Sequence, residues 1–279
     1  MSKKKNILVP TDFTKVADTA MNHAMKLATY TEGEVFILHV VDKAEHVEET
    51  RTKLKMEVER AKAWSDAVKV NPIVRVGSIY EEIGDAASEV DAGIIVMGTH
   101  GMRGIQLITG SRALRVVTSS QVPFIVVQER PIKEDGYSDI VVPLDLNKET
   151  KQKLSLVADM AKYFDSRVHI IVPKEEDEFL HNQLKRNIQF ADQFFSERGI
   201  EHKATIAEED SSDFVTAVVR HAVSVDADLI AIMNVSSGNI FGVLGVPYEQ
   251  EIITNEAMVP AMIMNPRKTS SGGGGWSFQ

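Results

Sequence analysis

The sequence repeats the stretch Ile7-Leu8-Val9-Pro10-Thr11-Asp12-Phe13 from position 140 onward, as Ile140-Val141-Val142-Pro143-Leu144-Asp145-Leu146. The same offset aligns Val35-Phe36-Ile37-Leu38 with Val168-His169-Ile170-Ile171 without a gap. Further along, we match Ile94-Ile95-Val96-Met97 with Ile230-Ala231-Ile232-Met233, and Val122-Pro123 with Val259-Pro260. Solenoid repeats run only about 20 to 50 residues. A repeat this long therefore predicts two whole domains of similar fold.

Each copy alternates short apolar runs with helical patterns. The run 6–10 is bounded by Pro and Asp, as is typical of strands buried on both faces of a parallel sheet. Val16, Ala20, Ala24 and Leu27 then follow at the spacing of one helix face, and Thr14 is placed to cap that helix. The other elements expected in the first copy are strands at 34–41, 73–76, 93–97 and 122–128, and helices at 46–68, 79–89 and 110–119. We predict an α/β protein of two repeated, doubly wound domains, each a five-stranded parallel sheet with helices on both faces.

Composition marks one linker and one tail. The polar segment 130–136 contains Pro and Gly and indicates a linker, so we expect one domain at 1–131 and a second at 138–267. The tail 268–279 is rich in Gly and Ser and ends in two aromatic residues, Trp276 and Phe278. Two interpretations of this tail stay open. It is either a tethered aromatic peptide that docks on a protein partner or a disordered terminus or cloning remnant.

Bulk properties exclude several function classes. The chain is 43% hydrophobic and 25% charged, which suits a packed globular protein. Its net charge of -9 argues against nucleic-acid binding through the phosphate backbone. The absence of cysteine excludes disulfides and thiolate sites. The first apolar run breaks at Pro10, too early for an export signal, and no segment approaches the roughly 20 apolar residues that cross a bilayer. We therefore expect a cytoplasmic protein with no membrane partner.

One glycine-rich stretch carries the strongest functional signal. Gly98-Thr99-His100-Gly101-Met102-Arg103-Gly104 follows a predicted strand, and Gly110-Ser111 opens a predicted helix. Glycine lets the backbone approach a ligand closely, and the free N–H groups at a helix start favour an anion such as phosphate. The Ser111 hydroxyl adds one donor. The alternative is a tight glycine turn that serves packing alone.

Three motifs, in this order, resemble the universal stress protein family. They are Ile7 to Phe13, then Leu38-His39-Val40, then Gly98-x-x-Gly101 with the later Gly110-Ser111. The resemblance covers essentially the whole chain, twice over. It implies an open sheet in strand order 3-2-1-4-5, with a ligand crevice between the ends of strands one and four. It also implies two groups of binding residues: Pro10, Thr11, Asp12 and Val40 at the adenine and ribose end, and Gly98, Gly101, Gly110 and Ser111 around the phosphates.

Alternatives stay open for individual residues. Asp12 either contacts the ligand or caps the following helix. His100 either donates to phosphate or is exposed, and no carboxylate adjoins it in sequence to make it a general base. Arginines 103, 112 and 115 either reach phosphate oxygens or are solvated helix charges. The chain also departs from the family pattern, which usually has nine residues between the second and third glycines; here there are eight, Met102 to Thr109.

The second copy has lost the glycine signature. Met233-Asn234-Val235 stands, in our alignment, where Met97-Gly98-Thr99 stands, and Gly245-Val246-Pro247 replaces Gly110-Ser111-Arg112. Pro247 removes a backbone donor, and Pro173 replaces Val40. We predict that this half packs as a pseudo-two-fold partner of the first, through the final strands, and does not hold a nucleotide in the standard way. A different ligand is the alternative.

The expected function is therefore an adenine-nucleotide (ATP)-binding regulatory protein of the stress response, with Mg²⁺ and one nucleotide per chain. We predict no catalytic residue and no protein-made metal site. The sequence has no Gly-x-x-x-x-Gly-Lys-Ser/Thr motif, which leaves at most slow ATP hydrolysis. Two alternatives stay open. One is a scaffold that binds proteins and no nucleotide; the other is an enzyme of the wider adenine-nucleotide α-hydrolase-like superfamily, although 10–14 is not its Ser-Gly-Gly loop. The chain is either a monomer or pairs again as a homodimer.

Overall fold

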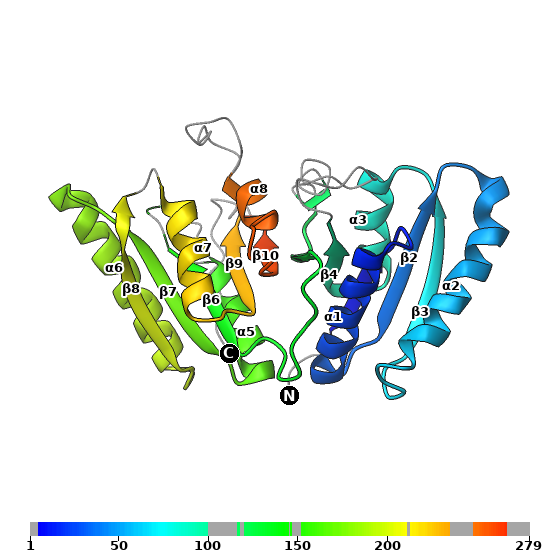
Figure 1. Cartoon of the computed structure of the whole chain (residues 1–279), viewed down its shortest axis with the longest axis horizontal. Coiled ribbons are helices and arrows are strands. Elements are labelled where there is room, and N and C mark those ends of the chain that lie inside the picture. Colours follow the sequence, from blue (N-terminus) through cyan, green and yellow to red (C-terminus); the bar gives the residue numbers. More distant parts are fainter. Residues whose placement is uncertain are drawn as a thin grey trace, which may run out of the picture.

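The structure, a computed structural model, describes residues 5–99, 116–117, 120–144, 146, 152–210, 213–234 and 248–266. Strands and helices alternate along these residues (Figure 1). The N-terminal half contains β1 (Asn6–Pro10), α1 (Lys15–Thr31), β2 (Val35–Val41), the 3-10 helix η1 (Ala44–His46), α2 (Val47–Ala61), β3 (Val70–Val76), α3 (Ile79–Glu89), β4 (Ala92–Gly98) and β5 (Phe124–Val127). The C-terminal half contains β6 (Asp139–Pro143), α5 (Lys153–Phe164), β7 (Arg167–Lys174), α6 (Glu178–Ser196), β8 (His202–Asp210), α7 (Phe214–Ser224), β9 (Leu229–Met233), α8 (Tyr248–Ile253) and β10 (Ala261–Met264).

All described strands belong to one ten-stranded sheet, in the order β3-β2-β1-β4-β5-β10-β9-β6-β7-β8. Each half contributes five neighbouring strands, and each has the order 3-2-1-4-5 when counted from its own first strand. Pairing is parallel within each half, whereas β5 and β10 pair antiparallel, with Ile125 opposite Met262. The predicted fold class is confirmed. The halves meet through their final strands, as expected, and this pairing makes the two sheets continuous.

Helices cover both faces of the sheet. Side chains of α1, α2, α5 and α6 pack in one buried cluster, and those of α3, α7 and α8 pack in another on the opposite face. Strand residues alternate between the two clusters; Ile7 and Val9 belong to the first and Leu8 to the second. Figure 1 shows β3 with α2 at one end of the sheet and β8 with α6 at the other, with β10 near the middle. Each apolar cluster therefore runs through both halves and continues across the junction between them.

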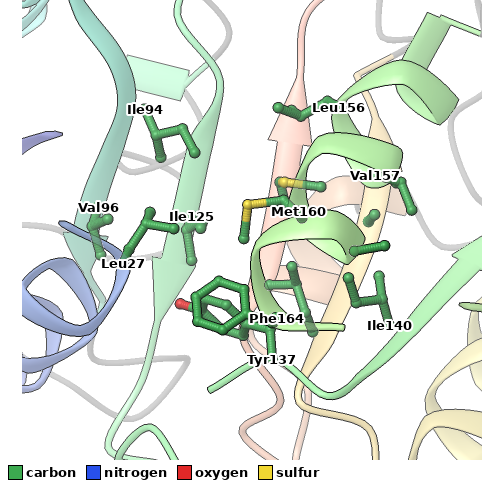
Figure 2. Close-up of a cluster of buried hydrophobic side chains, with 14 of the residues drawn as sticks. Leu27, Ile94, Val96, Ile125, Tyr137, Ile140, Leu156, Val157, Met160 and Phe164 are labelled. Atoms are coloured by element: carbon green, nitrogen blue, oxygen red, sulfur yellow. The ribbon is translucent and has the colours of Figure 1, made fainter. Parts of the chain in front are cut away.

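The junction between the halves is filled by large apolar side chains. Tyr137, which follows the predicted linker, is fully buried, and its ring lies 5.2 Å from that of Phe164 on α5, edge to face. Figure 2 shows Met160 and Phe164 of α5 facing Ile125 of β5. At the edge of this contact, Lys5 Nζ lies 2.8 Å from Asp159 Oδ2. The second half thus packs against the first, as the sequence led us to expect.

Local sequence explains the element boundaries. The Thr14 side chain accepts a hydrogen bond from Ala17 N at the start of α1, which confirms the predicted cap. Helix α2 ends at Ala61 and not near position 68; the next buried side chain after Ala61 is Val68, and the residues between them are exposed or half-buried. Strand β3 begins earlier than predicted and includes Pro72, which an edge strand tolerates.

The sheet register corrects one of our alignments. The backbone N–H of Ile95 donates to Pro123 O at 2.9 Å, and in the other half the N–H of Ile230 donates to Pro260 O at the same distance. The prolines had already been matched with each other. The structure therefore matches Ile95 with Ile230, one residue away from the pairing that the sequence suggested.

The corrected register changes the residue that stands at the end of the fourth strand of the repeat. The equivalent of Gly98 is Met233, so the alignment that placed Asn234 there is wrong by one residue. The turns before the two strands carry the signal that would have fixed it. Asp91 and Asp226 both adopt left-handed backbone geometry, with φ of 49° and 50°, and each follows a Val and precedes an Ala.

Among the described helices, none combines the length and apolar character needed to cross a bilayer.

Candidate functional site

A cavity of about 580 Å³ opens in the N-terminal half at the carboxyl ends of its strands. Pro10, Thr11 and Asp12 line it from the end of β1, Val40 from β2, and Gly98 from the end of β4. Strands β1 and β4 are neighbours whose helices cross to opposite faces, so the cavity lies where the strand order reverses. Open α/β sheets bind ligands at this point. The structure thus brings together five of the nine residues that the sequence singled out.

The other four, His100, Gly101, Gly110 and Ser111, lie outside the described residues. Their part in the site stays a prediction. Within the described residues, no group of three or more His, Asp or Glu side chains is arranged to hold a metal ion.

Asp12 lies on a short, heavily hydrogen-bonded loop between β1 and α1. Its Oδ1 accepts from the backbone N of Thr14 at 3.1 Å and from the Thr14 hydroxyl at 2.5 Å. Thr14, and not Asp12, caps α1, so Asp12 orients the capping residue. Phe13, between them, has a φ of 63°, a left-handed conformation that costs a residue with a Cβ on the order of 1 kcal/mol. The loop therefore holds the Asp12 carboxylate at the cavity wall with one oxygen bound to Thr14.

His39 is a cavity residue whose role the sequence analysis missed, although it belongs to the quoted Leu38-His39-Val40 motif. Its Nδ1 lies 2.7 Å from Thr11 O, and because a carbonyl only accepts, Nδ1 carries the hydrogen and donates. Its ring centroid lies 4.6 Å from that of Phe13. His39 thus ties the end of β2 to the loop that follows β1. The sequence held a signal for this contact, because a histidine near the end of one strand can reach a backbone carbonyl at the end of the neighbouring strand.

Gly98 is required by packing, whatever it contacts in a ligand. A Cβ at this position would lie 2.8 Å from both Val16 Cγ1 and Val16 O, on the first turn of α1. The next residue, Thr99, is fully buried, and its N–H donates to Val127 O at 2.8 Å. Of the two sequence-based alternatives for the glycine-rich stretch, ligand binding and packing, the packing role is therefore observed at Gly98, against helix α1. This leaves contact with a ligand as a prediction.

The outer wall of the cavity carries charged residues from the turn after β2, from η1 and from α2 that the sequence analysis passed over. His46 Nδ1 lies 2.9 Å from Asp42 Oδ1, and Lys53 Nζ lies 2.7 Å from Glu49 Oε1. The hydrogen bond from His46 lowers the pKa of Asp42, and the hydrogen bond from Lys53 lowers the pKa of Glu49. Both carboxylates are paired and exposed. This wall is a mixed-charge rim, in contrast to the apolar Leu38, Ile79 and Ile83 that also line the cavity.

The corresponding position in the C-terminal half contains a buried lysine. Lys153 is 3% exposed, and its ammonium group donates to the carbonyl of Pro143, the equivalent of Pro10. By the offset of the repeat, Lys153 corresponds to Ala20, a core residue of α1. Met233 stands in place of Gly98, and Pro173 in place of Val40. The second half has therefore replaced three small or ligand-facing features of the first with larger side chains or a proline.

An open, doubly wound α/β sheet with a cavity at its switch point defines a class of small-molecule-binding α/β proteins. Comparison with known proteins then gives the family. The model of the universal stress protein family matches residues 4–128. A universal stress protein of Methanocaldococcus jannaschii is 31% identical over 155 residues, which make up 45% of this chain and 96% of the relative. The chain belongs to the universal stress protein family.

Two further comparisons agree. A second universal stress protein of Methanocaldococcus jannaschii is 32% identical over 147 residues, covering 47% of this chain and 85% of the relative. The crystal structure of a universal stress protein from Archaeoglobus fulgidus superposes with a TM-score of 0.74 at 17% identity, covering 95% of this chain and 98% of that one. The last similarity extends the shared fold over both halves.

Proposed function

We propose that the chain binds an adenine nucleotide, ATP with Mg²⁺ before others, in its N-terminal half and acts as a regulatory protein of the stress response. One observation carries the proposal: the cavity at the switch point is lined by Pro10, Thr11, Asp12, Val40 and Gly98 together. These residues are the described members of the set that the family motifs single out. Membership of the universal stress protein family supports the role in stress.

The chemistry of the cavity suits a nucleoside. Its volume of about 580 Å³ is within the range of small-molecule sites. Leu38, Val40 and Ile79 give an apolar surface for a flat base, and Thr11 with Asp12 supplies polar atoms for ribose hydroxyl or ring amino groups. Carboxylates repel phosphate, so the triphosphate belongs at the side away from Asp12. We assign it to the glycine-rich stretch that begins at Gly98, including His100, Gly101, Gly110 and Ser111.

The role of Mg²⁺ follows from the side chains at hand. The described residues include no cluster of carboxylates and imidazoles for a metal. Mg²⁺ commonly enters nucleotide sites bound to phosphate oxygens and water, with few protein ligands. We therefore propose that Mg²⁺ arrives with the nucleotide, and that hydrolysis, for which we assign no catalytic residue, is at most slow.

We propose one nucleotide per chain. In the C-terminal half the buried Lys153 side chain lies against Pro143 O, and Met233 replaces the glycine at the end of the fourth strand. Val246 and Pro247, which lie outside the described residues, replace Ser111 and Arg112 in sequence. These changes disfavour a second site of the same kind.

The test is calorimetry with ATP and Mg²⁺ on wild-type protein and on Asp12→Asn. Asparagine keeps an oxygen for Thr14 but loses the charge, and charge-assisted hydrogen bonds are roughly twice as strong as neutral ones. We expect Asp12→Asn to weaken binding about tenfold. The matched control is Asp145→Asn, the same change at the equivalent position of the second copy, which should leave the affinity and a stoichiometry near one unchanged.

A second measurement is independent of affinity. Mass spectrometry of the small molecules released from freshly purified protein should find an adenine nucleotide at near one per chain. Absence of both the released nucleotide and any ATP heat would contradict the proposal and favour the protein-binding scaffold that the sequence left open.

The remaining sequence-based expectations belong to the same proposal. We retain a first domain at 1–131, a second at 138–267 and a tail at 268–279, and limited proteolysis tests these boundaries. The tail lies outside the described residues, and truncation after Lys268 tests whether it captures a protein partner. Sedimentation distinguishes a monomer from a homodimer, and cell fractionation tests the cytoplasmic location.

A further inference from the structure

The two halves exchange side-chain amide contacts across their junction. Asn265 directly follows β10, and its Nδ2 donates to Val117 O and to Ser120 O, each at 2.6 Å. Its Oδ1 accepts from Asn234 Nδ2 at 2.5 Å. Because the two carbonyls only accept, the amide nitrogen must face them and the oxygen must face Asn234. Both side-chain N–H groups of Asn265 therefore donate hydrogen bonds to backbone carbonyls of the N-terminal half.

The reciprocal contact, from the N-terminal half to the C-terminal half, is a single and longer hydrogen bond. Gln128 directly follows β5 and is equivalent to Asn265 in the repeat; its Nε2 donates to Asn255 O at 3.0 Å. Each final strand is thus followed by a carboxamide that reaches into the partner half. The N-terminal half provides one such bond and the C-terminal half provides two. The asymmetry places the stronger tie on the segment that precedes β5.

In the sequence, that segment follows the glycine-rich stretch that we propose for the phosphates. Val116 and Val117 are helical and almost fully buried, and Ser120 is 6% exposed. Ser120 is fixed further by its hydroxyl, which accepts from Val122 N at 3.0 Å. In the sequence, Val116 follows closely on Gly110-Ser111, the proposed phosphate-binding pair. A tie at Val117 and Ser120 therefore fixes the carboxyl end of the chain segment whose amino end carries the proposed phosphate contacts.

The other end of the tie lies at the switch point of the C-terminal half, where β6 and β9 are neighbours. Asn234 is the equivalent of Thr99 by the corrected register; it is 7% exposed, and its backbone N–H donates to Met264 O at 2.8 Å. Thr99 and Asn234 each follow the fourth strand of their half, where the strand order reverses. One partly buried hydrogen-bond chain, Asn234 to Asn265 to Val117 and Ser120, thus joins the end of β9 in the C-terminal half to the segment that precedes β5 in the N-terminal half.

We infer that Asn265 is a positioning residue for the nucleotide site of the N-terminal half, and that through it the C-terminal half sets the affinity of that site. The inference rests on the proposed function for its ligand. A half that holds no nucleotide then has a defined task, which is to hold the segment 116–120 in the position that the site needs. Asn265 acts through that backbone and touches no ligand itself.

The experiment compares Asn265→Asp with Gln128→Glu in the full-length chain, by calorimetry with ATP and Mg²⁺. Aspartate keeps the shape but sets an oxygen against two carbonyl oxygens, which leaves both without a donor. We expect Asn265→Asp to weaken ATP binding about tenfold, whereas Gln128→Glu, the same change at the reciprocal contact, leaves it within about twofold. Equal effects of the two variants, or no effect of Asn265→Asp, would overturn the inference.

A second readout separates this inference from the proposed function. Amide hydrogen exchange without nucleotide should quicken about tenfold in 116–122 of Asn265→Asp and stay unchanged there in Gln128→Glu. If wild-type protein binds no ATP, the proposed function fails, and with it the positioning of a nucleotide; the exchange rates then still show whether Asn265 fixes the segment. If Asn265→Asp does not fold, Asn265→Ala, which removes the donors without adding a charge, replaces it in both measurements.

Discussion

At the scale of single residues, His23 and Tyr137 form a buried polar pair. His23 Nε2 lies 3.0 Å from Arg130 O, so that nitrogen carries the hydrogen, and Nδ1 accepts from the Tyr137 hydroxyl at 2.8 Å. Burial lowers the pKa of His23 from 6.5 to about 4 and raises the pKa of Tyr137 well above its ordinary value. Both side chains are therefore neutral near pH 7, and together they fasten α1 to the segment between the halves.

Titration of His23 predicts a pH-dependent stability. The folded pKa is depressed, so between pH 6.5 and about 4 the unfolded chain binds a proton that the folded chain does not. The free energy of unfolding should fall by about 3 kcal/mol as the pH drops through this window, and this contribution should be constant above it. Urea unfolding at several pH values would show it as a difference between wild type and His23→Gln, because glutamine can make both hydrogen bonds and does not titrate. Identical pH profiles for the two proteins would refute the assignment.

Thr14 joins the cap of α1 to the cavity. Its side chain accepts from Ala17 N, and its hydroxyl donates to Asp12. We expect Thr14→Ala to lower the free energy of unfolding by about 1 kcal/mol and Thr14→Ser to restore most of it, since serine keeps both hydrogen bonds. Chemical denaturation measures both. A Thr14→Ser variant as unstable as Thr14→Ala would show that the methyl group, and not the hydroxyl, stabilises the loop.

At the scale of the elements, the turn between α1 and β2 requires a glycine, Gly33, that the sequence analysis did not single out. A Cβ on Gly33 would lie 1.9 Å from Lys5 O, whereas a Cβ on Gly84, within α3, would meet nothing within 4 Å. We expect Gly33→Ala to destabilise the protein by about 2 kcal/mol, because backbone must move. Gly84→Ala should stabilise it by about 0.5 to 1 kcal/mol, since alanine restricts the unfolded chain and favours the helix. Equilibrium unfolding in urea compares the two, and equal effects would contradict the structure at Gly33.

Sequence patterns predicted the strands and helices better than they predicted which residues of the two copies are equivalent. The strands of the first copy were found because each is an apolar run between turn residues. Helix α3 was predicted to the residue, and the structure shows the reason for its start, which is that the Ser78 side chain caps it. The register of the fourth strand was misjudged because Ile94-Ile95-Val96-Met97 aligns about equally well one residue away, among other apolar residues. Only the turn aspartates Asp91 and Asp226 mark it.

The sequence predicted the side of the candidate site that is formed by the strand ends, and it missed the charged wall opposite. Pro10 to Asp12, Val40 and Gly98 follow strands directly, and strand ends meet at one edge of a parallel sheet. The wall formed by Asp42, His46, Glu49 and Lys53 comes from the turn after β2, from η1 and from α2, and alternating charges are typical of a solvent-exposed helix face. Nothing in the sequence tells which charges of such a helix border a cavity, because that depends on how far the helix lies from the sheet.

At the scale of the whole molecule, the repeat alone does not predict the continuous sheet; the expectation that the halves meet through their final strands came from the family resemblance. A duplicated sequence predicts two similar domains, but the pairing of β5 with β10 brings together strands far apart in the chain. Both buried clusters contain residues of both halves, so the surface that one half would expose alone is apolar. An unpaired final strand is also an open edge that invites another strand. In the tandem chain, each half covers the apolar surface of the other half and pairs with its final strand.

A fragment of residues 1–131 should therefore replace its lost partner with a second copy of itself. Without the C-terminal half, β5 loses the backbone partners of Ile125 in β10, and the apolar side chains that face α5, including Leu27, lose their cover. We expect the fragment to sediment as a dimer at micromolar concentration, with β5 paired antiparallel to its own copy in place of β10. The full-length chain, measured beside it, should not gain a further partner at this edge. A fragment that stays monomeric, unfolds in one transition and binds no apolar dye would show that neither β10 nor α5 is needed to complete the first half.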